Sequence, residues 1–383
     1  MTVNLKKSDW KYHKIAIKVG SNVVTRNDGT LNTGRMLRIV EDVAVLSKQG
    51  LEVILISSGA VAAGRNSIIP NKRTGIVAAK QIWAAVGQVK LMSTYQFLFG
   101  KYGITAGQLL ATKEDFRDRR HYLNMKNCVS AMIEHNVLPI VNENDTTSIN
   151  ELMFTDNDEL SGMIASLMDS EALFILTNVD GIYAGHPGAS GVEILKEIRM
   201  DSDSPARFIT EAKSDFGRGG MLTKFMTAKK IASEGIDVFI ANGNIDSIVT
   251  SILKGRDVPF TRIAGRLKRT RSVKKWLNHS DTFARGAVYV NAGAKDALLG
   301  DKASSLLLIG ITKVEGYFGK GDIVRIIDEN GESIGLGKSQ YDSEKAKQCI
   351  GEKRNRPFIH YHYLVLDELS KTGINAGDTD NES

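Results

Sequence analysis

Short apolar runs alternate with helical stretches from residue 15 to about residue 250, and this alternation limits the possible folds more than any other feature. The runs are rich in β-branched residues, as strands are. They are IAIKVG (15–20), VILISSG (53–59), VLPIVNEND (137–145), ALFILTNVDG (172–181) and DVFIAN (237–242). Strands that are apolar throughout and alternate with helices form parallel sheets covered on both faces. The pattern therefore predicts an α/β fold with an open, mostly parallel sheet between two layers of helices. An α+β fold with the same elements is the alternative.

Helices are expected between these strands. In the first of them Leu37, Val40 and Ala44 share one face, as a period near 3.6 residues requires. The expected helices are Thr33–Gln49, Val77–Phe99, Arg120–Glu134, Glu159–Leu167 and Met221–Glu234.

The sequence pattern changes in the last quarter of the chain. Short strands separated by glycines are typical of a small β-barrel or sandwich. The expected strands are GAVYVN, SSLLLIGI, GDIVRIID, SIGLGKS and HYHYLVL, with one helix over Ser343–Ile350. We therefore expect an α/β domain over residues 1–260, a basic linker over 261–284, a small β-rich domain over 285–366 and a polar, disordered tail over 367–383.

The length of 383 residues allows two or three domains. The first 20 residues contain no apolar run long enough for a signal peptide. No stretch approaches the roughly 20 apolar residues of a membrane span. Cys128 and Cys349 lie far apart in unlike contexts, which indicates neither a disulfide framework nor a zinc site. These features predict a cytoplasmic protein that does not bind membranes.

Positive charge is concentrated between residues 254 and 275. Nine basic residues face a single acid, Asp257, so this stretch carries an excess of +8 in a chain whose net charge is +6. One interpretation is a patch that binds phosphate or nucleic acid. The other is a solvated linker between two domains.

Polar residues close four of the predicted strands. In an open parallel sheet, ligands bind beyond the carboxyl ends of the strands. The four closing segments are Lys18–Ser21, Ser57–Ala60, Asn142–Asp145 and Thr177–Gly181. We expect them to form one polar constellation at a single sheet edge.

Two further segments carry chemistry at the start of predicted helices. Residues 155–161 (TDNDELS) hold three acids, and Asp156 with Glu159 would also fit a helix-capping box. Residues 217–224 (GRGGMLTK) place three glycines and Lys224 where backbone N–H groups could cradle a phosphate. Neither the G-x-x-x-x-G-K-[ST] nor the G-x-G-x-x-G fingerprint is present. A nucleotide would therefore need a different phosphate site.

Several motifs together resemble the amino-acid kinase family, over roughly residues 14–365. They are IKVGSNVVT, ISSGAVAAGR, KQIWAAVGQ, VNENDTTS, FTDNDELSG, TNVDGIY and GGMLTK. The stretches GAKDALLG, SSLLLIGITKVEGYFGKGDIVRI and GLGKSQYDSEK resemble the PUA fold. The resemblance is to members that phosphorylate the side-chain carboxylate of L-glutamate with ATP and Mg²⁺, the first step of proline biosynthesis. It also implies feedback inhibition by proline and a homo-oligomer, a dimer or tetramer.

The resemblance implies roles for individual residues. Lys18, Lys224 and Asp158 correspond to the catalytic positions, and Asp158 would organise the lysines. Glutamate-binding positions correspond to Ser58, Gly59, Asp145 and Asn157. The ATP-binding positions correspond to Lys18, Thr177, Asn178, Arg218, Gly219, Gly220, Met221, Leu222, Thr223 and Lys224. No dedicated metal ligands are implied, because Mg²⁺ would be held mainly by ATP phosphates and water. Arg218, Leu222 and Asn178 depart from the residues usual in the family.

The expected chemistry agrees with the residues present. A glutamate side chain has a pKa of about 4.3, so the nucleophile is already ionised at neutral pH and needs no general base. No histidine is expected to be catalytic, and His360 and His362 are expected on the faces of a strand. Two alternatives stay open: another carboxylate kinase of the same fold, acting on acetylglutamate or aspartate, and RNA binding through the PUA-like domain.

Overall fold

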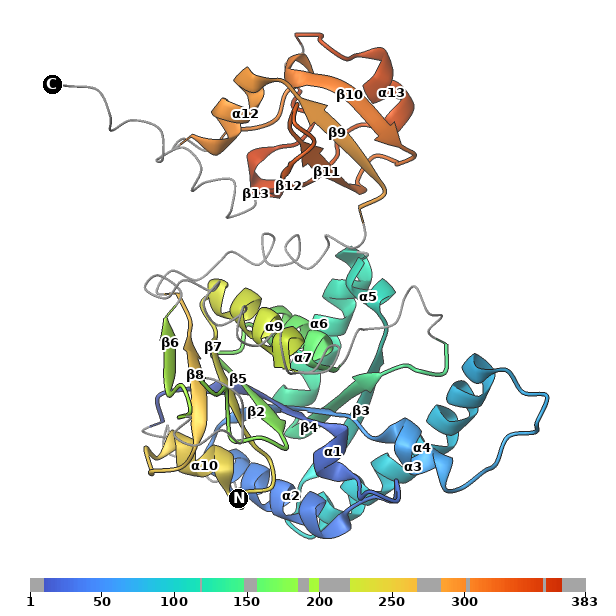
Figure 1. Cartoon of the computed structure of the whole chain (residues 1–383), viewed down its shortest axis with the longest axis vertical. Helices are drawn as coiled ribbons and strands as arrows, with labels where there is room; N and C mark the ends of the chain where they lie inside the picture. Colours follow the sequence, from blue (N-terminus) through green and yellow to red (C-terminus); the bar gives the residue numbers. More distant parts are fainter. Residues whose placement is uncertain are drawn as a thin grey trace, which may run out of the picture. The chain divides into compact units, whose positions relative to one another are not determined.

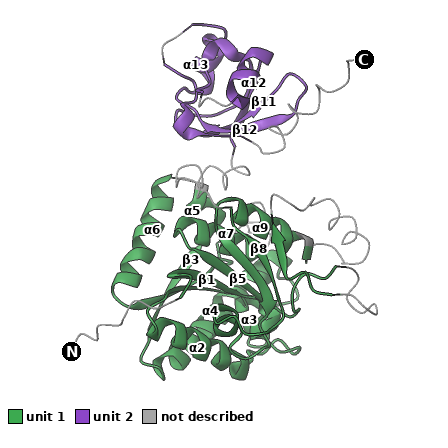
Figure 2. Ribbon diagram, turned by 90° about the vertical axis from the view of Figure 1, so that its left-hand side faces the viewer, with its two compact units in different colours: residues 1–269 green, residues 270–383 purple. Residues whose placement is uncertain are grey.

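The structure, a computed structural model, consists of two compact units, residues 1–269 and 270–383 (Figure 2). Each unit is described by itself. The structure describes residues 10–117, 119–147, 157–184, 193–199, 221–266, 284–300, 304–353 and 356–366. No helix among these residues is long and apolar enough to cross a membrane.

The first unit alternates strands and helices (Figure 1). Its strands are β1 (Lys14–Val19), β2 (Glu52–Ser57), β3 (Thr105–Ala111), β4 (Val137–Glu143), β5 (Ala172–Thr177), β6 (Glu197–Arg199), β7 (Asp237–Asn242) and β8 (Phe260–Ala264). Its helices are α1 (Ser21–Val24), α2 (Thr33–Lys48), α3 (Ala60–Arg65), α4 (Ile76–Gly100), α5 (Lys113–Arg117), α6 (Arg119–Glu134), α7 (Asn157–Leu167), α9 (Met221–Ser233) and α10 (Ile248–Leu253). The five predicted strands and five predicted helices are all present, with ends that differ by a few residues.

The strands form one sheet in the order β3-β4-β2-β1-β5-β7-β8-β6. All neighbours pair in parallel except β7 and β8, which are antiparallel. The mostly parallel sheet predicted from the apolar runs is therefore confirmed, and the α+β alternative is wrong. The four strands with polar ends are direct neighbours, in the order β4-β2-β1-β5.

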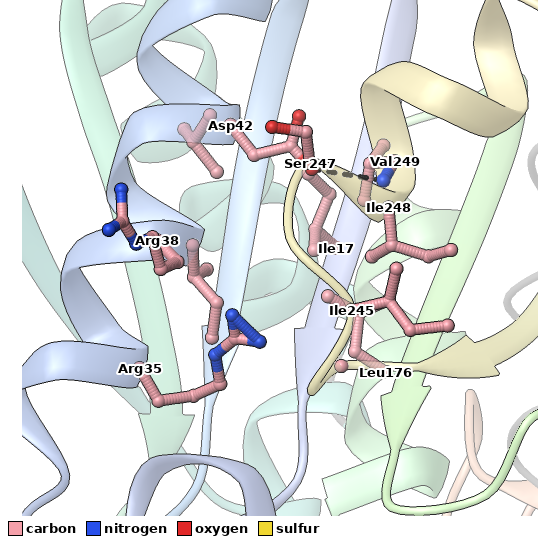
Figure 3. A pocket seen from close by; sticks show the side chains of 12 residues that line it. Ile17, Arg35, Arg38, Asp42, Leu176, Ile245, Ser247, Ile248 and Val249 are labelled. Atoms are coloured by element: carbon pink, nitrogen blue, oxygen red, sulfur yellow. Dashed lines mark hydrogen bonds between the residues drawn. The ribbon is translucent and has the colours of Figure 1, made fainter.

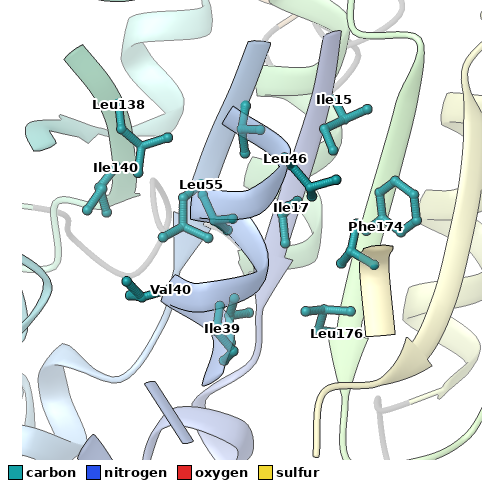
Figure 4. Packing of buried hydrophobic residues seen from close by; sticks show 14 of the residues in the cluster. Ile15, Ile17, Ile39, Val40, Leu46, Leu55, Leu138, Ile140, Phe174 and Leu176 are labelled. Carbon is teal, nitrogen blue, oxygen red and sulfur yellow. The ribbon is translucent and has the colours of Figure 1, made fainter. Parts of the chain in front are cut away.

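Helices cover both faces of this sheet (Figure 1). α2, α4 and α10 pack on one face, where an extensive apolar core gathers (Figure 4). α6, α7 and α9 lie on the other. Successive residues of a strand point to opposite faces. In β1, Ile15, Ile17 and Val19 enter the core beside α2, so Lys18 points toward the face covered by α7.

Three strands of this unit, β3, β6 and β8, were not predicted from the sequence, and β6 has only three residues. β3 (TAGQLLA) lies at the sheet edge and is only partly buried, so it needs no continuous apolar run. β8 occupies Phe260–Ala264, so the sheet extends past residue 260 into the stretch expected to begin the basic linker. Within it, Arg262 forms ion pairs with Asp237 and Glu197. Residues 267–283, which hold most of the basic stretch, lie outside the described residues.

The second unit contains a five-stranded sheet in the order β10-β9-β11-β12-β13. Its elements are β9 (Gly286–Val290), α12 (Ala292–Leu299), η3 (Leu308–Gly310), β10 (Ile311–Gly316), β11 (Ile323–Ile327), β12 (Ser333–Lys338), α13 (Ser343–Gln348), η4 (Tyr361–Tyr363) and β13 (Leu364–Leu366). β9 pairs with β11 in parallel, and the other neighbours are antiparallel. A separate apolar core includes Val288, Phe318 and Phe358. The predicted β-rich domain is thus present.

Three local predictions in this unit were wrong. SSLLLIGI is not a continuous strand, because η3 interrupts it and β10 starts only at Ile311. α12 was missed, although the Asn291 side chain caps it by accepting a hydrogen bond from the Ala294 N–H. His360 precedes a single 3₁₀ turn and His362 lies within it, so neither is on a strand. Leu306 instead bridges to Ile359, which shows that tertiary pairing decided these segments.

Candidate active site

An open cavity of about 450 Å³ lies at the carboxyl ends of β4, β2, β1 and β5. The polar strand ends predicted to converge therefore do converge. The cavity is lined by Lys18, Gly20, Ser21, Asn22, Val23, Ser58, Gly59, Ala60, Val61, Ala62, Arg65, Lys80, Asn142, Glu143, Asp145, Asn157, Thr177 and Lys224. Polar and charged side chains dominate this lining, as expected of a site for charged substrates.

A single carboxylate joins two lysines on this cavity. Asp158 lies in the first turn of α7 and is completely buried. Its Oδ1 is 2.5 Å from the Nζ of Lys18, near the end of β1. Its Oδ2 is 2.6 Å from the Nζ of Lys224, one turn into α9. Three segments far apart in the sequence thus place two ammonium groups side by side.

The charge state of Asp158 follows from its surroundings. Burial by itself would raise the pKa of this carboxyl. The charges of Lys18 and Lys224, and the hydrogen bonds that both lysines donate, outweigh burial and hold the pKa of Asp158 below its ordinary value. Asp158 is therefore an anion at neutral pH. Two ammonium groups around one carboxylate leave a net positive charge for a phosphate.

Amide and hydroxyl groups form a second part of the site. The Asn157 amide donates to the Ser58 hydroxyl at 2.7 Å and to the Asn142 side-chain oxygen at 3.0 Å. Asn142 in turn donates to the Gln88 side chain of α4 at 2.8 Å. The Asn157 side-chain oxygen is buried and accepts no hydrogen bond from the described residues. It is thus available to a donor on a ligand.

Gly59 allows the chain to turn from β2 into α3 at the cavity. Its φ is +108°, in the left-handed region that favours glycine. A Cβ here would lie 2.8 Å from a methyl carbon of Val24, too close for any side chain. The turn brings Ser58 and the start of α3 to the cavity wall.

Asp145 places another carboxylate on the wall of the cavity. It follows β4, and its side chain is only 14% exposed. Burial raises the pKa of Asp145 above its ordinary value, and Lys80 opposes that rise. The Lys80 Nζ lies 3.4 Å from Asp145 Oδ1.

The structure brings most of the predicted site residues together. Lys18, Ser58, Gly59, Asp145, Asn157, Thr177 and Lys224 all line the cavity, and Asp158 contacts both lysines. Asn178, Met221 and Thr223 are described but do not line it. Arg218, Gly219, Gly220, the side chain of Leu222 and the proposed cap Asp156 lie outside the described residues.

Sequence reasoning missed several residues of this cavity. Lys80, in the second turn of α4, lines the cavity, and Gln88, two turns further along, accepts a hydrogen bond from Asn142; neither follows a strand. Arg65 lines the cavity from α3, and its guanidinium lies 5.0 Å from the centre of the Trp83 ring. The motif KQIWAAVGQ contains Lys80 and Gln88, but no spacing in it indicates which side chains face a ligand.

The fold and the two-lysine site together define a class of protein: kinases whose domain is built on an open α/β sheet. Residues 13–242 match the amino acid kinase family, to which the chain therefore belongs. Residues 286–357 match the PUA domain. Among solved structures, carbamate kinase from Giardia lamblia bound to AMP-PNP is similar with a TM-score of 0.50 and 16% identity, covering 67% of this chain and 99% of that one. This likeness shows the fold alone.

Curated relatives narrow the class further. The glutamate 5-kinase of Bacteroides thetaiotaomicron is 50% identical over 358 residues, which cover 93% of this chain and 99% of that protein. The glutamate 5-kinase of Chlorobaculum tepidum is 45% identical over 356 residues, covering 93% and 98%. Both similarities extend through the two units of the chain.

Proposed function

We propose that the protein transfers the γ-phosphoryl group of ATP to the side-chain carboxylate of L-glutamate, giving L-glutamyl 5-phosphate and ADP. This reaction would be the first step of proline biosynthesis. The observation that carries the proposal is the Lys18–Asp158–Lys224 arrangement beside the Ser58 and Asn157 pair. The relatives named glutamate 5-kinase support glutamate as the acceptor.

The proposed chemistry needs charge neutralisation rather than proton transfer. An oxygen of the ionised γ-carboxylate attacks the γ-phosphorus in line, and the bond to the ADP oxygen breaks. Charge that develops on the phosphoryl oxygens and on ADP would be neutralised by Lys18, Lys224 and the Gly219–Gly220 loop. Asp158 is a positioning residue, since it holds both ammonium groups at fixed places. Thr177, Asn178 and the segment 218–224 would contact ATP.

Recognition of glutamate would use the other half of the cavity. Asp145 would pair with the α-ammonium, because its partly buried carboxylate lines the cavity and already faces an ammonium group, that of Lys80. Ser58 and Gly59 would hold a carboxylate group through hydroxyl and N–H donors, and the side-chain oxygen of Asn157 would accept a hydrogen bond from the ammonium. Proline carries the same α-ammonium and α-carboxylate chemistry, so we expect it to bind here as a feedback inhibitor that raises the KM for glutamate.

Mg²⁺ would accompany ATP in this reaction. This ion prefers oxygen ligands and usually binds through one or two carboxylates together with phosphates and water. The described lining fits that chemistry, since it offers the oxygens of Glu143, Asp145 and Asn142 and no thiol or imidazole. Mg²⁺ would be held mainly by the phosphates and would neutralise part of their charge.

An acyl-phosphate assay tests the proposal. Purified protein with ATP, Mg²⁺ and L-glutamate is expected to form a product that hydroxylamine traps as the γ-hydroxamate. Parallel reactions with aspartate and acetylglutamate test the other carboxylate kinases of this fold. Product from either of these, and none from glutamate, would refute the substrate. RNA binding as the main role would appear instead as salt-dependent RNA affinity without any acyl phosphate.

Assembly and location complete the proposal. Val89 and Phe97, two turns apart on α4, are 67% and 66% exposed, which supports a homo-oligomer, a dimer or tetramer. Light scattering after size exclusion would measure its mass. Both cysteines are free thiols, in keeping with a reducing cytoplasm.

A further inference from the structure

Lys80 contacts Asp145 across the cavity wall. Asp145 was predicted as a site residue, whereas Lys80 was not. Lys80 lies on α4, and Asp145 follows β4. Their charged atoms are 3.4 Å apart, and both side chains line the cavity. The Lys80 side chain is 41% exposed, whereas that of Asp145 is 14% exposed. The lysine side chain therefore borders solvent, whereas the carboxylate is largely enclosed.

Close packing of α3 on α4 holds Lys80 near the cavity. Gly64 and Gly87 lie where the two helices cross. A Cβ on Gly87 would be 1.7 Å from the Ala60 carbonyl oxygen, and one on Gly64 would be 1.9 Å from the Trp83 carbonyl oxygen. Because α3 starts at the cavity wall, this contact fixes α4 against the site. The backbone of Lys80 is thus held beside the cavity, while its flexible side chain can change direction.

A buried carboxylate without a counter-ion is strongly unfavourable. In the free protein Lys80 supplies the positive charge beside Asp145. An α-ammonium that arrives at Asp145 replaces this charge and releases the lysine. The α-carboxylate sits on the same carbon as the ammonium, so it comes to lie within reach of the released ammonium group. Lysine suits this exchange, because its charge is compact and its four-carbon stem is flexible.

We propose that Lys80 is a specificity-determining residue, which pairs with Asp145 in the free protein and with the α-carboxylate of the acceptor amino acid in the complex. This inference rests on the proposed function, since it assigns a partner for one group of the same acceptor. The exchange would explain why the site requires an acceptor that carries the α-ammonium and the α-carboxylate on the same carbon. An acceptor without the ammonium cannot displace Lys80, and one without the α-carboxylate lacks the group that Lys80 would contact.

A cycle of substrate and protein changes tests the exchange. 4-Aminobutyrate is glutamate without the α-carboxylate, and Lys80→Met removes the charge while it keeps most of the stem. For glutamate, Lys80→Met is expected to raise KM by about 10- to 100-fold, the effect of a lost charged hydrogen bond. The kcat and the KM for ATP should stay within about twofold, because the transferring phosphate does not meet Lys80. For 4-aminobutyrate, kcat/KM should be nearly the same in both proteins.

The cycle also separates this role from a structural one. Equal losses of kcat/KM for glutamate and 4-aminobutyrate would overturn the proposal, since the two changes would then be independent. An unchanged KM for glutamate would overturn it as well. Lys80→Arg should recover part of the lost affinity, and Lys90→Met, on an exposed part of the same helix, should match the wild type.

The wild-type protein in the same assay reports on the proposed function. If it used aspartate rather than glutamate, the substrate would be wrong, and the cycle would be run with aspartate and β-alanine, which differ by the same α-carboxylate. A selective effect of Lys80→Met on aspartate would then still support the role of Lys80. Turnover of none of these acceptors would refute both proposals.

Discussion

Asp158 shows how one residue can decide the arrangement of a whole site. It is buried between Lys18 and Lys224, and its position in the first turn of α7 favours a negative charge there. Without Asp158 the two ammonium groups would repel each other inside a region with little water. The carboxylate therefore stabilises the fold and keeps both lysines aimed at the place proposed for the phosphates.

Asp158→Asn should weaken both properties. We expect kcat to fall about 100- to 1,000-fold, the range for removal of one preorganised charge contact. The free energy of unfolding at pH 7 should fall by about 3 kcal/mol, because two buried cations lose their counter-ion. Turnover assays and chemical denaturation measure the two effects.

The pH dependence of stability checks the cause. The pKa of Asp158 is lowered in the folded state, so its stabilisation is present above the unfolded pKa of about 3.9 and is lost as pH falls through the folded value. The stability gap between wild type and Asp158→Asn should thus be largest near neutral pH and shrink below about pH 4. A gap that stays constant down to low pH would contradict this account.

At the scale of elements, α10 is capped by a residue from another helix. Asp42 of α2 is buried and accepts a hydrogen bond from the Val249 N–H at 2.9 Å (Figure 3) and another from the Thr250 N–H at 3.1 Å. The Thr250 hydroxyl also donates to it. Ser247, at the usual capping position, makes no side-chain bond and has a left-handed φ of 53°. The first N–H groups of α10 are thus satisfied by a carboxylate that is distant in the sequence, whereas in most helices a residue at the helix start accepts these hydrogen bonds.

Removal of this cap should destabilise the first unit. Asp42→Ala leaves two buried N–H groups without an acceptor, so the free energy of unfolding should fall by about 2–3 kcal/mol. Calorimetry would follow the transition of the first unit. Glu41→Ala, the neighbouring position on α2, should cost less than about 1 kcal/mol, because its ion pair with Arg38 is partly exposed. Equal losses in the two variants would argue against a capping role.

At the scale of the whole molecule, the residues of the proposed active site belong to one of the two units. Each has its own sheet and its own apolar core. Every residue that lines the proposed active site belongs to residues 1–269.

A chain that ends after residue 269 should therefore remain folded and active. We expect its kcat and its KM for ATP to stay within about threefold of the full-length values, because a compact unit with its own core can fold alone. Circular dichroism and the hydroxamate assay would measure fold and turnover. A folded truncated chain with little activity would show that the second unit takes part in catalysis.

Much of the fold could be predicted from local patterns. The five core strands are apolar on both faces, so their sequences carry a strong signal that tertiary contacts do not override. β3 escaped prediction because an edge strand buries little, and η3 and η4 escaped because pairing with distant segments such as Ile359 decides their shape. The convergence of the polar strand ends was predictable, since parallel strands share one carboxyl edge.

The sequence by itself determined which residue types stand at the strand ends, and hence that a polar site with Lys18, Ser58 and Asp145 would form there. Only the tertiary structure decided that Asp158 lies between two lysines and that Lys80 meets Asp145. The physical reason is the separation along the sequence of the residues that determine each feature. Strand and helix periodicity is written in neighbouring residues, whereas these ion pairs depend on how α4, α7 and α9 pack on the sheet.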